Sequence, residues 1–388
     1  MLFISCGFTG KPSGIGRILS YIIKAISDYF DVYVLADFSI NKDLEELFQK
    51  NGAKTLSGKT RGYSLKGLYE IFKVVKKVNP SCVVSNDRCS TIKTFLLSRF
   101  LNFKHVGIVH GVISLNRLYS RKFSRANYFL DGFMYGLYCK ALKEAHKDIA
   151  VSMVVKKDLI YSCKLPSEKI EVIYNYVDTE LFKPLSYNPA EIRGKLGLPT
   201  IPFTLLFCGR LELEKNPEFL IKVVLELSRK GYDVQGIFIG DGTLRNELET
   251  EVKKLRLEDK VFFIGLTKDL TGFYNACDLL LHPCSIESFG LVVAEAMACG
   301  RPVIGFNGGN LPYLIKDGET GFLVKPNDLN QTCEKIELYI RDKQMWYNHA
   351  KASRDFIVQN FSWMGFSNQY IDFFKTIAGK EVKSAVKV

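Results

Sequence analysis

The feature that most constrains the fold is a regular alternation of short apolar runs with longer amphipathic segments. In the first half the apolar runs are "LFISCG", "DVYVLAD", "SCVVSND", "HVGIVHG" and "DIAVS". The second half repeats the rhythm with "FTLLFCGR", "VQGIFIGDG", "KVFFIG", "LLLHPC" and "RPVIGFNGG". Such alternation is typical of parallel sheets covered by helices. The sequence therefore predicts an α/β fold of two doubly wound, Rossmann-like domains facing a central cleft.

The charge distribution also divides the chain in two. Its 388 residues are enough for two domains with separate cores. Residues 1–190 carry 28 Lys and Arg against 16 Asp and Glu, whereas residues 191–388 carry 25 of each. The whole net charge of +12 thus lies in the first half, which indicates a module that faces something anionic. The Pro-rich segment at residues 178–200 is interpreted as a linker.

Composition and terminal sequence favour a cytoplasmic protein. No stretch reaches the ~18 apolar residues of a membrane-spanning helix, and "MLFISCG" reads as a strand rather than a signal peptide. The ten cysteines include no C-x-x-C pair, so reduced thiols are expected rather than a disulfide framework.

Glycines and cations follow several predicted strands. Gly14, Gly16 and Gly265 lie where backbone amides at a helix start can bind phosphate, although turn formation alone also explains them. Arg210 and Lys215 flank a loop between a strand and a helix, where two cations can neutralise a diphosphate. The alternative for this pair is an ordinary solvated loop.

Two carboxylates lie eight positions apart in "SIESFGLVVAEAMACG". Glu287 falls in a loop and Glu295 in a predicted helix over residues 289–297, with Phe289 and Gly290 at its start. Two helical turns separate the carboxylates by ~10 Å, which suits the two ends of an elongated ligand with hydroxyl groups. The alternative is a capping acid and a surface glutamate, but apolar neighbours around Glu295 favour a hydroxyl partner.

His110 ends the apolar run "VGIVH" in the first half. A neutral imidazole at the carboxyl end of a strand can bond a sugar hydroxyl or a leaving oxygen, and a purely structural histidine is the alternative.

Taken together, these stretches resemble the retaining glycosyltransferases of family 4, which have the GT-B fold. The resemblance rests on the E-x7-E element in "ESFGLVVAEAMACGRPVI", on "GRLELEKNP", "IGDG", "NACDLLLHPC" and "DGETGFLV", and on "SGIGR" near the start. It implies an acceptor-side domain over residues 1–185 and a nucleotide-sugar donor domain over residues 186–361. A final helix at residues 362–380 is expected to pack back on the first domain.

The resemblance also assigns roles in the second domain. Arg210 and Lys215 would hold the nucleotide diphosphate, and Glu295 would accept hydrogen bonds from the ribose. Glu287 and the backbone at Phe289 and Gly290 would hold the donor sugar.

Further roles fall in the first domain. His110 would contact the donor sugar near its reacting carbon, and Gly14 and Gly16 would let a loop close on the diphosphate. The implied reaction transfers a hexose-type sugar, from a UDP-sugar by preference, with retention and with no metal or other cofactor.

The sequence departs from the family pattern at two places. Asn175-Tyr176 stands where the family often has Asn-Gly, and a positive-φ turn is difficult at tyrosine. Pro312-Tyr313 stands where the family often has Pro-Glu, so a polar contact to the donor is lost or replaced.

Three other functions compete with the transferase. The first is a nucleotide-sugar 2-epimerase on the same fold, and the second is a non-enzymatic protein that binds glycan or nucleic acid. The third, a dehydrogenase, is suggested by "SGIGRIL", but Leu19 occupies the third glycine position of that fingerprint.

Basic and aromatic residues alternate in residues 117–138, beginning with Arg117, Arg121 and Arg125. This mixture suits an anionic membrane surface, or nucleic acid as the less favoured partner. A solvated arginine face beside an aromatic core is the alternative. We expect peripheral attachment to the inner face of the membrane and a glycan or lipid-linked acceptor.

Overall fold

The protein divides into two compact units, here called unit 1 and unit 2. The computed structural model describes all residues except 7–13, 115–124, 187–188, 200–202 and 380–388. Unit 1 comprises Met1–Tyr176 and Trp363–Val388, and unit 2 comprises Val177–Ser362. The first border thus falls earlier in the chain than the residue 185 expected from sequence.

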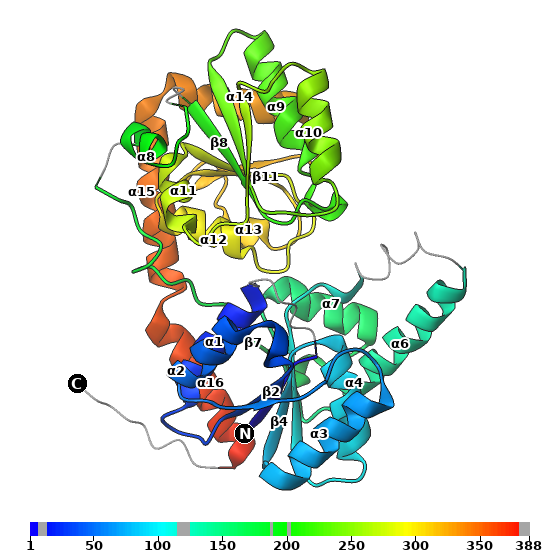
Figure 1. Ribbon diagram of the computed structural model, residues 1–388. Coiled ribbons are helices and arrows are strands. Elements are labelled where there is room, and N and C mark those ends of the chain that lie inside the picture. Colours follow the sequence, from blue (N-terminus) through cyan, green and yellow to red (C-terminus); the bar gives the residue numbers. More distant parts are fainter. Residues whose placement is uncertain (7–13, 115–124, 187–188, 200–202, 380–388) are drawn as a thin grey trace, which may run out of the picture. The chain divides into compact units, whose positions relative to one another are not determined.

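Unit 1 is built on one parallel seven-stranded sheet in the order β3-β2-β1-β4-β5-β6-β7 (Figure 1). Its central strands are buried on both faces, which is why they read as continuous apolar runs. The strands are β1 (Leu2–Ile4), β2 (Tyr33–Ala36), β3 (Lys54–Ser57), β4 (Cys82–Ser85), β5 (Lys104–Val109), β6 (Lys147–Ala150) and β7 (Ile170–Val172).

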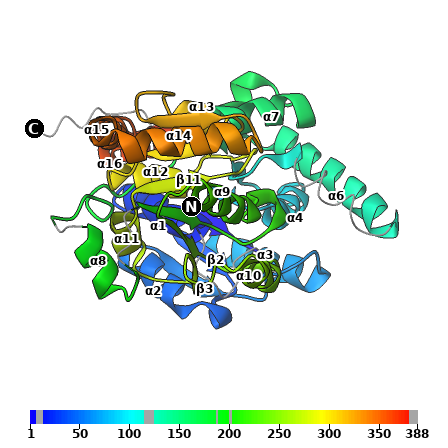
Figure 2. The same ribbon diagram turned by 90° about the horizontal axis from the view of Figure 1, so that it is seen from above.

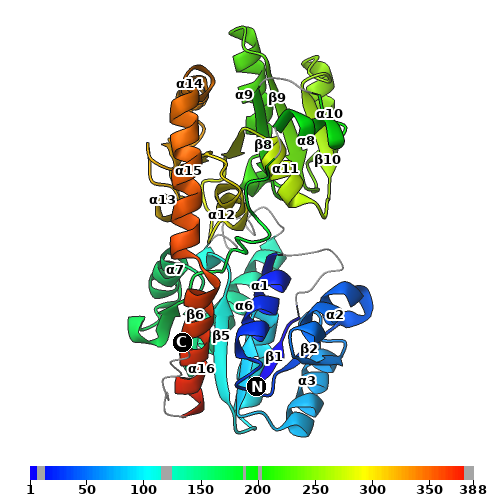
Figure 3. The same cartoon turned by 90° about the vertical axis from the view of Figure 1, so that its left-hand side faces the viewer.

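Local capping explains where several helices of unit 1 begin and end. Asp87 and Ser90 form a capping box at the start of one helix, and Asn79 ends another with a φ of 44°. The final helix of the chain packs beside the first, as expected from sequence (Figure 3). The helices are α1 (Gly14–Ile26), α2 (Lys42–Lys50), α3 (Leu65–Val78), α4 (Arg88–Ser98), α6 (Arg125–Glu144), α7 (Met153–Cys163) and α16 (Trp363–Ala378), with 3-10 turns at Phe38–Ile40 and Ser167–Lys169.

Unit 2 has a parallel six-stranded sheet in the order β10-β9-β8-β11-β12-β13. Its strands are β8 (Phe203–Cys208), β9 (Val234–Ile239), β10 (Val261–Gly265), β11 (Leu279–His282), β12 (Val303–Phe306) and β13 (Gly321–Val324). In each sheet the strand order reverses beside a central strand. The expected doubly wound architecture is therefore confirmed for each unit.

Helices cover the sheet of unit 2, and α14 packs against both α9 and α15 (Figure 2). They are α8 (Pro189–Lys195), α9 (Glu218–Arg229), α10 (Arg245–Lys254), α11 (Leu270–Ala276), α12 (Leu291–Ala298), α13 (Leu311–Leu314), α14 (Leu329–Arg341) and α15 (Lys343–Asn360). The expected linker contains α8, whose Arg193 is buried and donates to the carbonyl of Ala276 at 2.8 Å. Residues 189–195 therefore belong to unit 2, and interpreting them as linker was wrong.

Tyr176 anchors an aromatic cluster at the end of the first stretch of unit 1. Its ring centroid lies 4.9 Å from Tyr21, 5.3 Å from Trp363 and 5.8 Å from Phe366. The φ of Tyr176 is not positive, so the strained positive-φ turn that the sequence suggested at Asn175-Tyr176 does not occur. The tyrosine instead ties α1 to α16 by edge-on ring contacts.

The cysteines are mostly reduced, but not all of them. Cys139 of α6 and Cys163 of α7 form a disulfide, and the other eight are free. The expectation of reduced thiols throughout was therefore wrong for this pair, because packing of α6 on α7 brings together two cysteines 24 residues apart.

Two of the sequence expectations concern membranes. In the part of the chain that the structure describes, no helix is both long enough and apolar enough to span a bilayer. Residues 117–124 of the basic and aromatic segment lie outside the described residues, and residues 125–138 lie in α6.

Candidate functional site

The candidate site of unit 2 lies at the carboxyl ends of β8 and β11. These strands are parallel neighbours, so the loops that follow them meet at one edge of the sheet. After β8 come Arg210 and a 3-10 turn at Leu213–Lys215, and α9 begins at Glu218. After β11, which ends at His282, a loop carries Glu287 to the start of α12.

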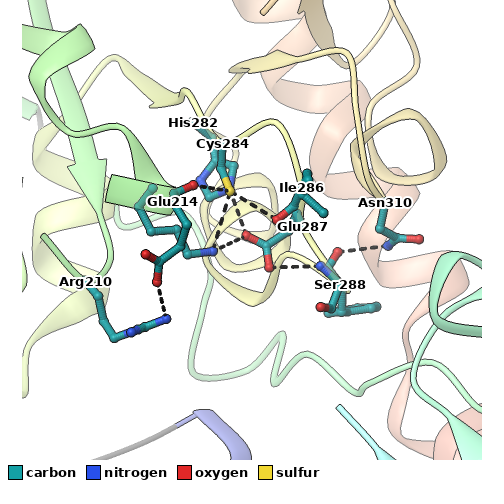
Figure 4. A network of polar contacts seen from close by, with 10 residues as sticks. Arg210, Glu214, His282, Cys284, Ile286, Glu287, Ser288 and Asn310 are labelled. Atoms are coloured by element: carbon teal, nitrogen blue, oxygen red, sulfur yellow. Dashed lines mark hydrogen bonds and ion pairs between the residues drawn. The ribbon is translucent and has the colours of Figure 1, made fainter. Parts of the chain in front are cut away.

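Glu287 is the centre of a buried polar cluster (Figure 4). Its Oε2 accepts from Lys215 Nζ at 2.6 Å and lies 3.0 Å from His282 Nε2. The side chains of Lys215 and Glu287 are only 20% and 15% exposed. Cys284 completes the cluster, with its Sγ 3.8 Å from Lys215 Nζ. Lys215 and Glu287 thus lie together, and the lysine contacts the carboxylate directly, whereas their roles toward a ligand stay predictions.

The charges of this cluster stabilise each other. Burial alone would raise the pKa of Glu287, but the Lys215 ammonium and the His282 hydrogen bond outweigh it and hold that pKa below its usual range. Burial likewise opposes the charged forms of Lys215 and His282. Contact with Glu287 nevertheless raises the pKa of Lys215, and hydrogen bonds with Cys284 and Glu287 raise the pKa of His282. The site therefore holds a carboxylate that accepts from the Lys215 ammonium and lies beside an imidazole whose protonated form is favoured.

The loop that carries Glu287 is held by a second loop through its backbone. Asn310 N donates to the Glu287 carbonyl at 2.8 Å, and Asn310 Nδ2 donates to the Phe289 carbonyl at 2.9 Å. Gly309 has a φ of 54°, and a Cβ there would lie 2.3 Å from Glu287 N. Gly290, at the start of α12, has a φ of 96°. Both positions favour glycine because of their positive φ. A Cβ at Gly309 would also displace the Glu287 backbone, and one at Gly290 would lie 2.9 Å from Leu314 Cδ1.

Arg210 differs from Lys215 in being exposed. Its side chain is 69% exposed, and Nη2 donates to Glu214 Oε1 at 2.6 Å (Figure 4). The guanidinium therefore lies in water at the rim of the cluster, where it can exchange Glu214 for an anionic ligand.

Glu295 has a hydroxyl partner within the protein. Its side chain is 2% exposed in α12, and Tyr274 of α11 donates its hydroxyl to Glu295 Oε2 at 3.0 Å. The sequence argument expected the hydroxyl of a ligand, whereas the structure supplies the hydroxyl of Tyr274 as one partner. Its contact with a ribose stays a prediction.

Gly265 ends β10 with a φ of 78°. A Cβ there would lie 3.1 Å from Arg245 Nη1. Residue 265 therefore needs glycine for its backbone conformation.

The side chain of Phe289, also predicted near the donor sugar, is buried.

The remaining predicted residues belong to unit 1. Gly14 and Gly16 form the start of α1. His110 follows β5, and its Nε2 is buried with no hydrogen-bond partner among the described residues. Burial lowers the pKa of His110 to about 4, so the imidazole is neutral at physiological pH.

Sequence reasoning missed His282, Cys284, Tyr274 and Asn310. His282 had a usable signal, since it ends the apolar run "LLLH" five residues before Glu287. Tyr274 and Asn310 had none, because their partners lie 21 residues away in sequence in each case.

The cluster also contains the donor set of a cation site. Ligand atoms of His282, Cys284 and Glu287 lie within 4.8 Å of one another. The ammonium of Lys215 already occupies Glu287 Oε2, however, and supplies positive charge at that point. The expectation that no metal is needed stays a prediction.

Two family profiles cover most of the chain. "Glycosyl transferases group 1" matches residues 189–356, and "Glycosyltransferase Family 4" matches residues 12–181. The chain belongs to the glycosyltransferases of family 4, and its fold is GT-B.

Curated relatives are similar over part of their length. The α-D-kanosaminyltransferase of Streptomyces kanamyceticus is 24% identical over 287 residues, 73% of each chain. The D-inositol 3-phosphate glycosyltransferase of Mycolicibacterium smegmatis is 30% identical over 227 residues, 58% of this chain and 51% of the relative. The N-acetyl-α-D-glucosaminyl L-malate synthase of Bacillus anthracis is 25% identical over 53% of each chain. The match thus spans only about half the length of most of these relatives.

Solved structures show the same fold over almost the whole chain. HepE of Anabaena, in complex with UDP and glucose, superposes with a TM-score of 0.81 at 23% identity, over 97% of this chain and 99% of HepE. A sucrose-phosphate synthase of Thermosynechococcus elongatus gives a TM-score of 0.78 at 20% identity, over 97% and 98%.

Proposed function

We propose that the protein transfers a hexose-type sugar from a UDP-sugar to a glycan or lipid-linked acceptor, with retention of configuration and without a metal. The observation that carries the proposal is the buried Lys215–Glu287–His282 cluster with Arg210 at its rim, inside the segment that matches the group 1 glycosyltransferases. UDP is the preferred nucleotide because HepE, which shares the fold, was solved with UDP and with UDP-glucose.

Arg210 and Lys215 would bind the diphosphate. Arg210 offers a planar fork of donors to phosphate oxygens, and Lys215 offers a fixed charge already oriented by Glu287. As the sugar–phosphate bond breaks, negative charge grows on the leaving oxygen, and preoriented cations stabilise it at no reorganisation cost. The departing phosphate would take the acceptor proton.

The donor sugar and ribose would meet the carboxylates and backbone of unit 2. Glu287 Oε1 accepts a hydrogen bond from Ser288 N at 3.2 Å, and a carboxylate oxygen has further acceptor capacity that a sugar hydroxyl can use. The backbone at Phe289 and Gly290 would contact the same sugar, and Glu295 the ribose. Glu295 would then accept hydrogen bonds from both the ribose and Tyr274.

The unit 1 residues would act on the donor from the other domain. His110 would offer a neutral imidazole to the sugar near its reacting carbon, consistent with a Nε2 that has no partner among the described residues. Gly14 and Gly16 would allow close backbone approach to the diphosphate.

A lipid-linked acceptor would lie in a membrane, and the exposed surface of α3 suits contact with anionic lipid. Leu65 is 83% and Tyr69 56% exposed, and Lys66 and Lys73 are exposed on the same helix. Apolar and basic side chains exposed together favour an interfacial position. Vesicle flotation tests this: binding should be stronger to phosphatidylglycerol than to phosphatidylcholine vesicles, and equal binding would refute the membrane proposal.

The donor proposal is tested by nucleotide-induced thermal stabilisation with UDP, GDP and ADP. A nucleotide at 100 times its dissociation constant stabilises by about 2.7 kcal/mol. UDP should stabilise Arg210→Ala and Glu295→Ala less than the wild type, by about 1.4 kcal/mol if affinity falls tenfold. Lys351→Ala, which removes an exposed charge of α15, is the matched control and should respond as the wild type does.

Transfer itself is followed by release of UDP from UDP-glucose with and without a glycan acceptor, in buffer with EDTA. A transferase releases UDP in an acceptor-dependent way that EDTA does not change, and product anomers by NMR report retention. Release without acceptor would instead favour the 2-epimerase. No UDP response, or equal responses in the variants, would favour a binding protein.

A further inference from the structure

A second cluster of reactive side chains lies in unit 1 and includes none of the residues assigned above. Cys6 lies two residues after the end of β1, and Cys89 lies in the first turn of α4, shortly after β4. Because β1 and β4 are parallel neighbours, both cysteines come to the same edge of the sheet. Their Sγ atoms and a carboxylate oxygen of Asp87 lie within 4.8 Å of one another.

Only one member of this pair is accessible. Of the eight free cysteines, seven are buried and Cys89 is half-buried, and all ten cysteines lie within the described residues. Cys6 is 5% exposed behind it. An oxidant in solution therefore reacts with Cys89 first. The Sγ of Cys6 is then close enough to react with the oxidised Cys89.

The surroundings of Cys89 favour the thiolate. Hydrogen bonding from Cys6 lowers the pKa of Cys89, and the charge of Lys93 lowers it further against the effect of burial. Lys93 is one turn along α4, with its Nζ held by the Thr60 carbonyl at 2.8 Å. Cys89 also lies at the positive end of an 11-residue helix. When protonated, its thiol donates to the Gly62 carbonyl at 2.8 Å.

The same groups suit a metal ion less well. Asp87 Oδ2 accepts from Cys6 N at 2.7 Å and Oδ1 accepts from Ser90 N at 2.8 Å, so this carboxylate is committed to capping α4. The nearby Lys93 ammonium would also repel a bound cation. Thiol chemistry is therefore the function that this geometry favours.

We propose that Cys6 and Cys89 are a dithiol that hydrogen peroxide oxidises reversibly to a disulfide. The Cys89 thiolate attacks one oxygen of the O–O bond, which gives Cys89 sulfenic acid and releases hydroxide, protonated to water. The Cys6 thiol then attacks the sulfenic sulfur and displaces a second water as the S–S bond forms. Two thiols are oxidised and one hydroperoxide is reduced, and an added dithiol reverses the change.

The disulfide would tie the end of β1 to the start of α4. Ligands of doubly wound domains bind at this edge of the sheet, and the glycine-rich sequence begins directly after Cys6 at Gly7. The oxidation site stands on the thiols alone and does not depend on the proposed transferase activity.

The test uses the purified full chain with about one equivalent of hydrogen peroxide in a chelating buffer, followed by non-reducing trypsin digestion and mass spectrometry. Trypsin should yield residues 1–17, because Lys11 precedes a proline, and residues 89–93. We expect these two peptides linked after peroxide and separate after dithiothreitol. The Cys139–Cys163 link, present before oxidation, is the internal control for detection.

Two single variants separate the steps, with circular dichroism as the check on folding. In Cys6→Ser, Cys89 sulfenic acid should accumulate and be trapped by dimedone. In Cys89→Ser, Cys6 should stay reduced. Cys89 should also react with iodoacetamide about tenfold faster or more than buried Cys333, since each unit of pKa changes the thiolate fraction about tenfold. The proposal is overturned if Cys89 and Cys333 react at equal rates, or if Cys89 reaches sulfinic acid in the wild type with no link to Cys6.

Discussion

Replacing Lys215 by methionine should leave Glu287 as a buried charge short of one partner. The substitution keeps the length and apolar stem of the side chain and removes the ammonium that lies 2.6 Å from Glu287 Oε2. At this separation the attraction is about 6 kcal/mol for an effective dielectric constant of about 20, and the cost of desolvating both groups offsets much of it.

The expected loss in free energy of unfolding lies between the values for an exposed and a buried ion pair. Removing one partner of a buried ion pair costs about 3–5 kcal/mol, whereas an exposed pair contributes about 0–1 kcal/mol. His282 still contacts the same carboxylate oxygen at 3.0 Å after the change. We therefore expect Lys215→Met to lower the free energy of unfolding of unit 2 by about 3 kcal/mol, the lower end of the buried range.

The chain offers a direct assay, because it has two tryptophans and each unit holds one of them. In a Trp363→Phe background, Trp346 of α15 alone reports urea unfolding of unit 2, where its Nε1 donates to the Asp278 carbonyl at 2.8 Å. Lys351→Met is the matched control, since its pair with Asp355 is 70% and 52% exposed.

Two measurements test whether the Lys215–Glu287 pair is a buried ion pair. Lys351→Met should cost less than about 1 kcal/mol. The double variant Lys215→Met/Glu287→Gln should recover at least about 1 kcal/mol relative to Lys215→Met, because it also removes the buried charge. If Lys215→Met costs no more than Lys351→Met, the cluster is not the preformed ionic site described here.

Three further predictions follow from single residues. Arg210→Ala should change stability by less than about 1 kcal/mol, because the side chain is exposed, yet weaken UDP binding about tenfold or more in calorimetry, since bonds to charged groups contribute about 1.5–3 kcal/mol. Gly309→Ala should lower the free energy of unfolding by about 3 kcal/mol through backbone strain and overlap with the Glu287 backbone. Gly318→Ala, at a φ of 75° with open space around it, should lower it by about 1 kcal/mol. Equal losses of the two variants in urea unfolding would contradict this reasoning. Burial raises the pKa of Asp148 well above its usual value, so the folded state holds a proton that the unfolded state releases, and stability falls as pH rises from about 4 through the folded pKa. Asp148→Asn should flatten that slope in urea unfolding measured across this range, and an unchanged slope would contradict the assignment.

The sequence predicted those features that depend on local pattern. Buried parallel strands and amphipathic helices have short-range periodicities, so both doubly wound sheets and the final helix α16 were predicted. The α8 segment was missed because its seven residues lie among prolines and carry almost no periodic signal. The Cys139–Cys163 bond could not be predicted either, since the spacing of cysteines says nothing about which helices pack together.

The candidate site divides in the same way, and the division has a physical meaning. Arg210, Lys215 and Glu287 were found because charges next to strand ends are conspicuous in sequence. What the sequence did not reveal is that Lys215 and Glu287 already neutralise each other, whereas Arg210 remains in water with a partner that can be exchanged. A ligand phosphate would therefore gain most from Arg210, while Lys215 and His282 keep the Glu287 carboxylate charged and oriented in a buried site where it would otherwise take up a proton. Loss of Arg210 should thus reduce affinity with little effect on folding, and loss of Lys215 should affect both, which separates ligand recognition from site preorganisation in one pair of variants.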